Sequence, residues 1–283
     1  MNIMSQHLFR LFPFLITPTK IFTQMLTMKI SSPAAPVWIN ANPSFKHFEG
    51  RIVRYLSRQV PIAYWQYSQK LDEASSMDTA LMLLHDYLKG REQPVNLIGH
   101  STGGLLGLLY ARKYPQRVKS LTLLGVGSSP AIDWQTHYYQ MRKLLPCSQE
   151  MLLARMVRMM FGYQSRGNVI ELIKILKKDL VTAPTNHSLY QLDRVASGAM
   201  PMPMAICGSE NDGIVDRPAL DRWKDYLKED DLLWTNVSGH HFFHYFFPER
   251  TGRQIIKFWQ RVEAKSFVSP QTKILEKTCY TSS

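Results

Sequence analysis

Short apolar runs alternate with longer segments of helical periodicity over two parts of the chain, 36–127 and 201–265. The apolar runs predict buried strands, because a parallel strand covered on both faces is apolar at nearly every position. The predicted strands cover residues 36–40, 60–65, 95–98, 118–126, 202–207 and 232–237. Between them, segments such as 77–88 place apolar residues three or four positions apart, which predicts amphipathic helices. The pattern indicates an α/β domain with a mostly parallel, doubly wound sheet and flanking helices.

The alternation stops over residues 128–200, where the pattern is helical, most clearly over 151–160 and 169–180. Methionines recur in this block at Met141, Met151, Met156, Met159 and Met160. They either line a pocket for an apolar group or pack the block onto the core, and the sequence leaves both open. Because strands resume after residue 200, we expect the block to be an insertion into the α/β domain.

The two ends of the chain differ from the rest. Residues 1–35 contain Arg10, Lys20 and Lys29 but no acidic residue, and prolines interrupt their apolar clusters. We expect a poorly ordered extension there, because the apolar run is too short and broken to span a bilayer. The final helix is expected to end near residue 265, followed by a loose polar tail over 266–283.

Charge and cysteine content limit the kinds of binding partner and the cellular compartment that we expect. The formal net charge of +12 favours anionic neighbours, but Lys and Arg are spread thinly and no nucleic-acid motif accompanies them. We therefore expect no nucleic-acid partner, while peripheral contact with an anionic membrane stays open. The three cysteines, Cys147, Cys207 and Cys279, are odd in number and lack metal-ligand spacing, so we expect no metal site and a reducing, cytoplasmic compartment.

The most informative stretch joins the predicted strand 95–98 to a predicted helix over 105–112. It has the sequence Gly-His-Ser-Thr-Gly over residues 99–103. A serine on so sharp a strand-to-helix turn has a strained backbone, and glycines two residues to either side remove Cβ clashes. The stretch resembles the nucleophile elbow of the α/β-hydrolase fold superfamily, with Ser101 as the nucleophile.

The resemblance covers about residues 36–265 and implies an organisation for the whole chain. Residues 36–127 and 201–265 would form the α/β-hydrolase core, and 128–200 would be the helical cap that many members insert after the post-elbow strand. His100, inside the elbow, is expected to pack beneath the nucleophile rather than react.

The resemblance also implies a catalytic acid after the strand 202–207. Asp212 is the position that matches the family pattern, since it follows a glycine-containing turn and precedes Gly-Ile-Val. Glu210 and Asp216 are close neighbours in sequence, and Asp133 occupies the alternative place where some members carry the acid.

Three histidines compete for the role of catalytic base in the family's last loop. Counting back from the start of the final helix at Pro248 selects His241, with His244 as a second family histidine. Counting forward from Gly239 selects His240 instead. We assign His241 and keep His240 as the alternative.

The loop after the first strand departs from the family. It usually carries a His-Gly pair and supplies one backbone N–H to the oxyanion hole, whereas residues 40–44 are Asn-Ala-Asn-Pro-Ser. Because a backbone donor needs geometry rather than a side chain, we place the oxyanion hole at the backbone N–H groups of Asn42 and Thr102.

The resemblance thus implies a cofactor-independent serine hydrolase that acts by acyl transfer on a small-molecule ester or thioester with an apolar group. Carbon–carbon bond hydrolysis, a lyase or a perhydrolase activity on the same triad is an alternative. A non-catalytic binding or assembly protein is another, which the absent His-Gly pair keeps open. A peripheral membrane lipase is a further one, motivated by the acid-free N-terminus and the aromatic run 242–247.

Overall fold

The computed structural model describes residues 34–67, 72–73, 75–185 and 187–278, with the backbone alone described over 266–278. The extension expected over 1–35 therefore lies almost entirely outside the described residues. Within them, no helix combines the length and apolar character needed to cross a bilayer.

Six strands form one parallel sheet in the order β2-β1-β3-β4-β5-β6. They are β1 (Val37–Asn40), β2 (Ala63–Gln66), β3 (Val95–His100), β4 (Val118–Leu124), β5 (Met204–Ser209) and β6 (Leu232–Asn236). Every residue of β1, β3 and β5 is buried, as expected for strands covered on both faces. The parallel sheet predicted from the apolar runs is confirmed. One boundary differs: β2 begins at Ala63 rather than at residue 60, since Pro61 has no N–H to give to a ladder.

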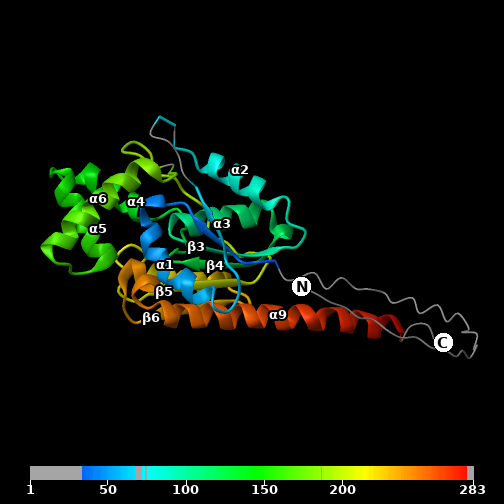
Figure 1. Cartoon of the computed structure of the whole chain (residues 1–283). Helices are drawn as coiled ribbons and strands as arrows, with labels where there is room; N and C mark the ends of the chain where they lie inside the picture. Colours follow the sequence, from blue (N-terminus) through cyan, green and yellow to red (C-terminus); the bar gives the residue numbers. More distant parts are fainter. Residues whose placement is uncertain (1–33, 68–71, 74, 186, 279–283) are drawn as a thin grey trace, which may run out of the picture. The chain divides into compact units, whose positions relative to one another are not determined.

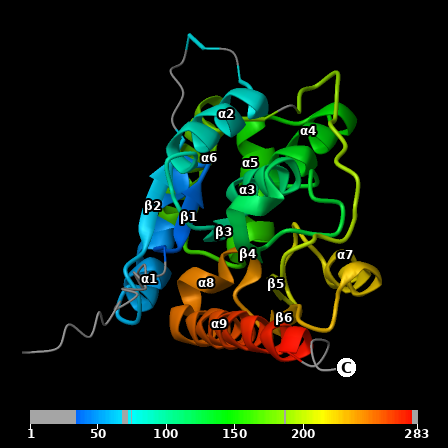
Figure 2. The same ribbon diagram turned by 90° about the vertical axis from the view of Figure 1, so that its right-hand side faces the viewer.

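Successive strand residues point to opposite faces and supply two separate cores. Val37 and Ile39 pack in one core with α2 (Met77–Leu88) and α3 (Thr102–Lys113). Trp38 packs in the other with α1 (Lys46–Leu56) and α9 (Pro248–Thr278). Figure 2 shows α2 and α3 on one side of the strands and α8 (Phe243–Phe246) and α9 on the other. This arrangement confirms the doubly wound fold.

The segment between β4 and β5 contains α4 (Trp134–Leu144), α5 (Gln149–Phe161) and α6 (Arg166–Thr182), which lie together in Figure 1. Ser148 and Ser165 cap α5 and α6 by accepting backbone N–H groups. Met156 and Met160 are fully buried, while Met159 lines a cavity described below. The helical insertion thus stands where the sequence predicted it; the limits 128–200 and its role as a cap stay predictions.

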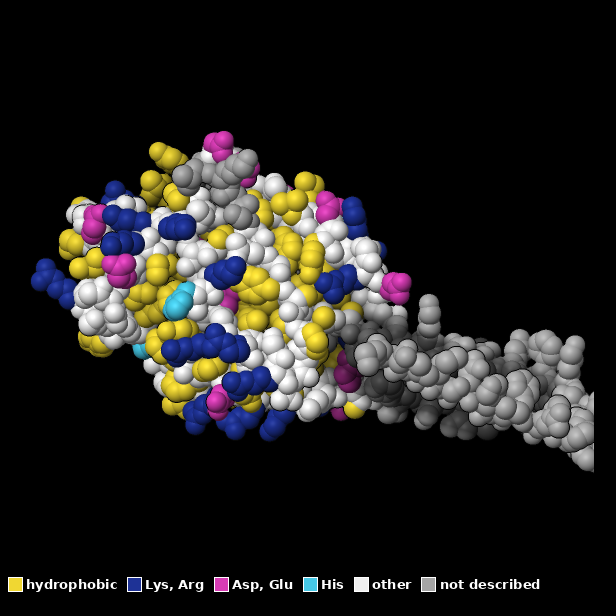
Figure 3. Space-filling model, viewed as in Figure 1, with side chains coloured by type: hydrophobic (Ala, Val, Ile, Leu, Met, Phe, Trp, Pro, Cys, Tyr) yellow, Lys and Arg dark blue, Asp and Glu magenta, His cyan; other side chains and the backbone are white. Residues whose placement is uncertain are grey.

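Short elements complete the chain: η1 (Pro43–Phe45), η2 (Pro115–Arg117), α7 (Arg217–Asp221), η3 (Arg222–Tyr226) and η4 (His240–Phe242). The final helix is longer than predicted, because α9 continues past residue 265 to Thr278. The expected tail contains good helix formers over 273–277, which let the helical backbone continue where polarity alone suggested a loose end. On the face in Figure 3, Lys and Arg side chains are scattered among hydrophobic ones, with few acidic side chains.

Candidate active site

The turn from β3 to α3 holds Ser101 in a strained conformation. Its φ is 49° and its ψ is −121°, which is rare for a residue with a Cβ. Its N–H donates to the carbonyl of Leu124 at 2.9 Å and ties the turn to the end of β4. A turn of this kind presents the serine hydroxyl at the carboxyl edge of the sheet.

The two glycines that flank Ser101 are required by close backbone contacts. A Cβ on Gly99 would lie 2.4 Å from the carbonyl group of Gly103, and a Cβ on Gly103 would lie 2.3 Å from the carbonyl oxygen of Ile39. Real Cβ atoms essentially never approach so closely. The G-x-S-x-G spacing is therefore a steric requirement of this turn.

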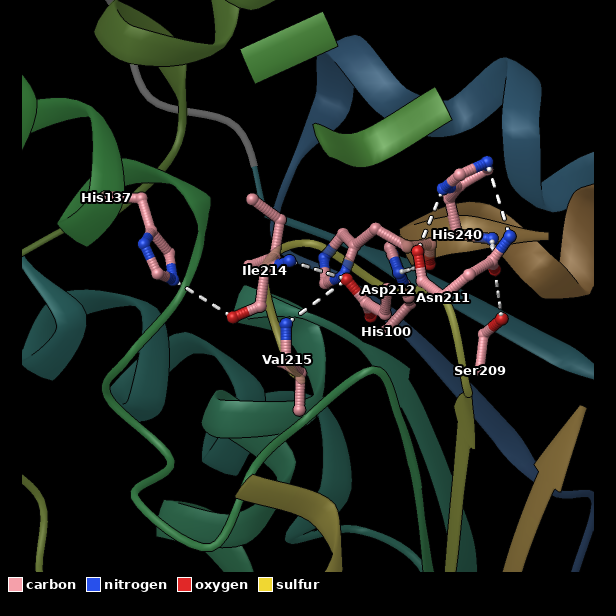
Figure 4. A network of polar contacts seen from close by, with 9 residues as sticks. His100, His137, Ser209, Asn211, Asp212, Ile214, Val215 and His240 are labelled. Carbon is pink, nitrogen blue, oxygen red and sulfur yellow. Dashed lines mark hydrogen bonds and ion pairs between the residues drawn. The ribbon is translucent and has the colours of Figure 1, made fainter. Parts of the chain in front are cut away.

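Asp212 and His241 form a buried pair. The Nδ1 of His241 lies 2.9 Å from Oδ2 of Asp212, and both side chains are fully buried. The other carboxylate oxygen of Asp212 accepts the N–H groups of Ile214 at 2.8 Å and Val215 at 3.1 Å (Figure 4). His137 of α4 donates from Nε2 to the carbonyl of Ile214 at 3.0 Å, so the insertion also holds the acid loop. These contacts fix the carboxylate toward the imidazole.

The structure distinguishes the two competing histidines. The ring of His240 donates from Nδ1 to the carbonyl of Asn211 at 2.9 Å, and its backbone N–H donates to the Asn211 side chain (Figure 4). Its backbone has a φ of 51°, and its ring lies against Gly162 of the insertion. His240 thus bonds to the residue before Asp212, and His241 is the histidine that Asp212 contacts.

The other candidate acids have different partners. Asp133 caps α4 through its side chain, and Asp216 caps α7 in the same way. Glu210 forms an exposed ion pair with Arg217 at 3.3 Å. Each of these carboxylates has a structural role away from the imidazole of His241.

The buried polar atoms that lack hydrogen-bonding partners among the described residues include Oγ of Ser101 and Nε2 of His241. Ser101 is 3% exposed and His241 is 0% exposed. Buried polar atoms are nearly always paired, so an unpaired one calls for an explanation such as a bound substrate or a catalytic role. These two atoms belong to the serine and histidine that the sequence selected.

Asn42 and Thr102, the expected oxyanion donors, follow neighbouring strands. Asn42 comes just after β1, and Thr102 is the first residue of α3, whose N–H has no acceptor within the helix. The close approach of Gly103 to Ile39 brings the two backbones together.

Carboxylates of the insertion hold the side chains of both residues. Asn42 donates from Nδ2 to Oδ2 of Asp179 at 2.9 Å, and Thr102 donates from Oγ1 to Oδ2 of Asp133 at 3.3 Å. Asp179 was missed from the sequence because it follows a basic stretch in α6. The helical spacing could have identified it, because Asp179 lies on the same buried face of α6 as Leu172 and Leu176. An acidic residue on an otherwise apolar helix face is a candidate functional residue.

Asn40, the last residue of β1, binds a buried carboxyl group of α1 rather than one of the insertion. It donates to Glu49 of α1 at 2.8 Å, and the Tyr64 hydroxyl donates to the same oxygen at 2.6 Å. Burial raises the pKa of Glu49 to about 7, although the hydrogen bonds from Asn40 and Tyr64 oppose the shift. The amides that replace the family's His-Gly pair are thus used to attach the loop to buried carboxyls.

Two further histidines, His100 and His244, and several aromatic rings pack around His241. His100 is buried beneath it and donates from Nε2 to its carbonyl at 2.9 Å, and burial holds the pKa of His100 well below its usual value. The ring of His244 lies 4.3 Å from that of His100, and burial lowers its pKa to about 3. Phe242 stacks on Phe161 of the insertion with ring centroids 4.4 Å apart. The surroundings of His241 are therefore two buried neutral histidines, His100 and His244, and the apolar rings of Phe242 and Phe161.

A cavity of about 660 Å³ lies between α5 and the loops that carry Asp212 and His241. Its lining residues are Ala154, Arg155, Arg158, Met159, Asn211, Gly213 and His240. Across the described residues, no cluster of three or more His, Cys, Asp or Glu side chains is arranged to hold a metal ion.

Known proteins resemble parts or most of the chain. A family model described as the alpha/beta hydrolase fold matches residues 88–156. An uncharacterized protein of Nostoc sp. is 43% identical over 224 residues, covering 79% of this chain and 90% of that protein. An uncharacterized protein of Synechocystis sp. is 36% identical over 251 residues, covering 88% and 100% respectively.

Solved structures share the fold at low sequence identity. A meta-cleavage product hydrolase from Pseudomonas fluorescens superposes with a TM-score of 0.60 and 13% identity, covering 81% of this chain and 92% of that one. Naproxen esterase from Bacillus subtilis gives a TM-score of 0.56 and 14% identity, with coverage of 81% and 85%. At such identities the likeness extends to the fold alone.

Proposed function

The chain belongs to the α/β-hydrolase fold family, and we propose that it is a serine hydrolase that cleaves a carboxylic ester or thioester with an apolar group by acyl transfer. The observation that carries the proposal is the buried pair of Asp212 and His241, which turns Nε2 of His241 away from the carboxylate. Neither this Nε2 nor Oγ of Ser101 has a hydrogen-bonding partner among the described residues.

The pair sets the tautomer of the histidine. A carboxylate is an acceptor only, so Nδ1 of His241 carries the proton that Asp212 binds, and Nε2 keeps its lone pair. In the proposed reaction Nε2 takes the proton of Ser101 while Oγ attacks the carbonyl carbon. The imidazolium, stabilised by Asp212, then protonates the leaving group, and water hydrolyses the acyl-serine by the same base.

The oxyanion of each tetrahedral intermediate would bind to the backbone N–H groups of Thr102 and Asn42. Thr102 offers an N–H without an acceptor inside α3, at the positive end of the helix dipole, which favours negative charge. The preference for an apolar group is supported by the buried ring of Phe242, whose centroid lies 5.7 Å from that of His241 and 5.3 Å from that of Phe45.

Hydrolysis of p-nitrophenyl esters with acyl chains of 2 to 12 carbons, by wild type and Ser101→Ala, tests the proposal. We expect turnover by wild type only, with Ser101→Ala unchanged in thermal stability. Equal turnover by the variant would contradict the role of Ser101. If every ester failed although a fluorophosphonate labelled Ser101, the ester assignment would be wrong, and carbon–carbon bond hydrolysis would be favoured instead.

A further inference from the structure

The cavity beside α5 has cationic side chains on its wall. Arg155 and Arg158 both line it, and residues three positions apart lie on the same side of a helix. The guanidinium of Arg158 lies over the ring of Tyr163 and donates one hydrogen bond to its hydroxyl, so that other N–H groups remain for a ligand. The other described residues that line the cavity are Ala154, Met159, Asn211, Gly213 and His240, none of which is acidic.

The charges of these two arginines are not used within the described part of the chain, where neither forms an ion pair. Glu150 of α5 pairs with Lys177 of α6 instead, and Glu210, next to the lining residue Asn211, pairs with Arg217. A concave site with two guanidinium groups and no carboxylate on its wall attracts an anion. Guanidinium groups bind carboxylate and phosphate oxygens through paired hydrogen bonds.

The opposite wall of the cavity belongs to the loops that carry the proposed acid and base. Gly213, next to Asp212, donates its N–H to the carbonyl of Met159 at 3.3 Å, and a Cβ on Gly213 would lie 3.0 Å from Met159. The ring of His240 lies against Gly162, the residue that follows α5. Direct contacts therefore hold α5 against both loops, and a ligand in the cavity would touch residues adjacent to Asp212 and to the catalytic histidine.

The size of the cavity indicates more than a bare ion. Its volume of about 660 Å³ is typical of sites for small organic molecules, and Ala154 and Met159 make part of its wall apolar. We propose that the cavity binds an organic anion, with a carboxylate or phosphate group held by Arg155 and Arg158 and an apolar body against Met159. The anion is either the charged end of the substrate of the proposed hydrolase or a separate ligand beside the triad. Its binding does not depend on turnover.

Calorimetry with Ser101→Ala protein tests the binding site without turnover, by comparing hexyl phosphate and hexanoate with 1-hexanol. We expect at least one of the two anions to bind about ten-fold or more tightly than 1-hexanol, as charge-assisted hydrogen bonds allow. Replacing both arginines, Arg155→Gln and Arg158→Gln, should reduce that advantage to within about two-fold, and because both side chains are exposed the fold should persist.

A charge-matched control separates a local site from general attraction to a basic protein. Arg166→Gln with Lys178→Gln removes the same charge from exposed positions of α6 that do not line the cavity, so the preference for the anion should remain. If neither anion bound more tightly than 1-hexanol, or if the control lost the preference as fully as the α5 variant, the anion site would be wrong.

Ester turnover by wild type then identifies the source of the anion. Mono-p-nitrophenyl adipate carries a terminal carboxylate that p-nitrophenyl hexanoate, with the same number of acyl carbons, lacks. A KM for the adipate lower by about five-fold or more, lost in the α5 variant, would identify the substrate's own charged end. Equal KM values together with anion binding would identify a separate ligand. Anion binding without turnover of either ester would count against the hydrolase function and leave the anion site standing.

Discussion

The nucleophile turn and the loop after β1 meet at the same edge of the sheet, but they are built differently. The turn is fixed by backbone contacts within residues 99–103 and against β1, where Gly99 and Gly103 leave no space for a Cβ. The end of β1 and the loop after it are held by side chains from elsewhere: Asn40 binds Glu49 of α1, and Asn42 binds Asp179 of α6.

This difference has consequences for sequence change and for pH. A motif made of backbone contacts depends on a few neighbouring residues, and no titratable group takes part. A loop anchored by buried carboxyls depends on distant residues, and burial raises the pKa of both Glu49 and Asp179 to about 7. We therefore expect the turn to be intolerant of substitution but insensitive to pH, and the loop to be responsive to both.

The largest expected effect comes from filling the space at the turn. Gly103→Ala places a Cβ against the carbonyl of Ile39, so we expect a loss of more than about 4 kcal/mol in the free energy of unfolding, measured with urea. Gly50→Ala is the matched control, because a Cβ on Gly50 meets nothing within 4 Å and lies in the exposed part of α1. It should gain about 1 kcal/mol from better helix propensity. Equal losses in both variants would show that the backbone contacts at Gly103 do not constrain the turn.

Breaking the acid–histidine pair should remove activity without removing the fold. In Asp212→Asn the amide holds the imidazole in the wrong tautomer, so we expect kcat to fall by about 10³–10⁴-fold in ester hydrolysis. Asp216→Asn is the control, since Asp216 caps α7 and an asparagine caps as well. Loss of activity in the control, or little loss in Asp212→Asn, would remove Asp212 from the proposed triad.

The same contrast explains what the sequence could predict. The strands and the turn followed from apolar runs and from glycine spacing, because both are local consequences of backbone geometry. The pairing of Asn42 with Asp179 spans 137 positions and depends on how α6 packs, so no local pattern announces it. Likewise, counting along the sequence assigned His241 and left His240 as the alternative, and the hydrogen bond between the His241 ring and Asp212 depends on the loop backbone, with its positive φ at His240.

Loosening the loop should have an intermediate effect. Asn42→Ala removes the donor to Asp179 and frees the backbone that we propose as an oxyanion donor, so kcat should fall about 10–100-fold with little change in KM. The same assay on Ser44→Ala, which removes only a 3.3 Å contact to Thr182 in this region, should change kcat less than about three-fold. Similar losses in the two variants would contradict a specific role for Asn42.

The most gradual expected effect is a pH dependence of stability from Glu49. Because burial raises its pKa from 4.5 to about 7, the folded protein retains this proton to higher pH than the unfolded chain does. Its contribution to stability is therefore fully present below about pH 4.5 and is lost as the pH rises to about 7. Relative to Glu49→Gln, wild type should lose at most about 3 kcal/mol between pH 4.5 and pH 8 in urea unfolding. Parallel pH profiles for the two proteins would refute the shift.

The central claim, that Ser101 is activated by His241 within a working triad, is tested most directly by the rate of fluorophosphonate labelling, with the adduct located by mass spectrometry. Wild type and His240→Ala should label rapidly on Ser101, because His240 bonds to Asn211 and not to Asp212. His241→Ala should label at least about 100-fold more slowly while remaining folded. Rapid labelling of His241→Ala, or no labelling of Ser101 in wild type, would contradict the account.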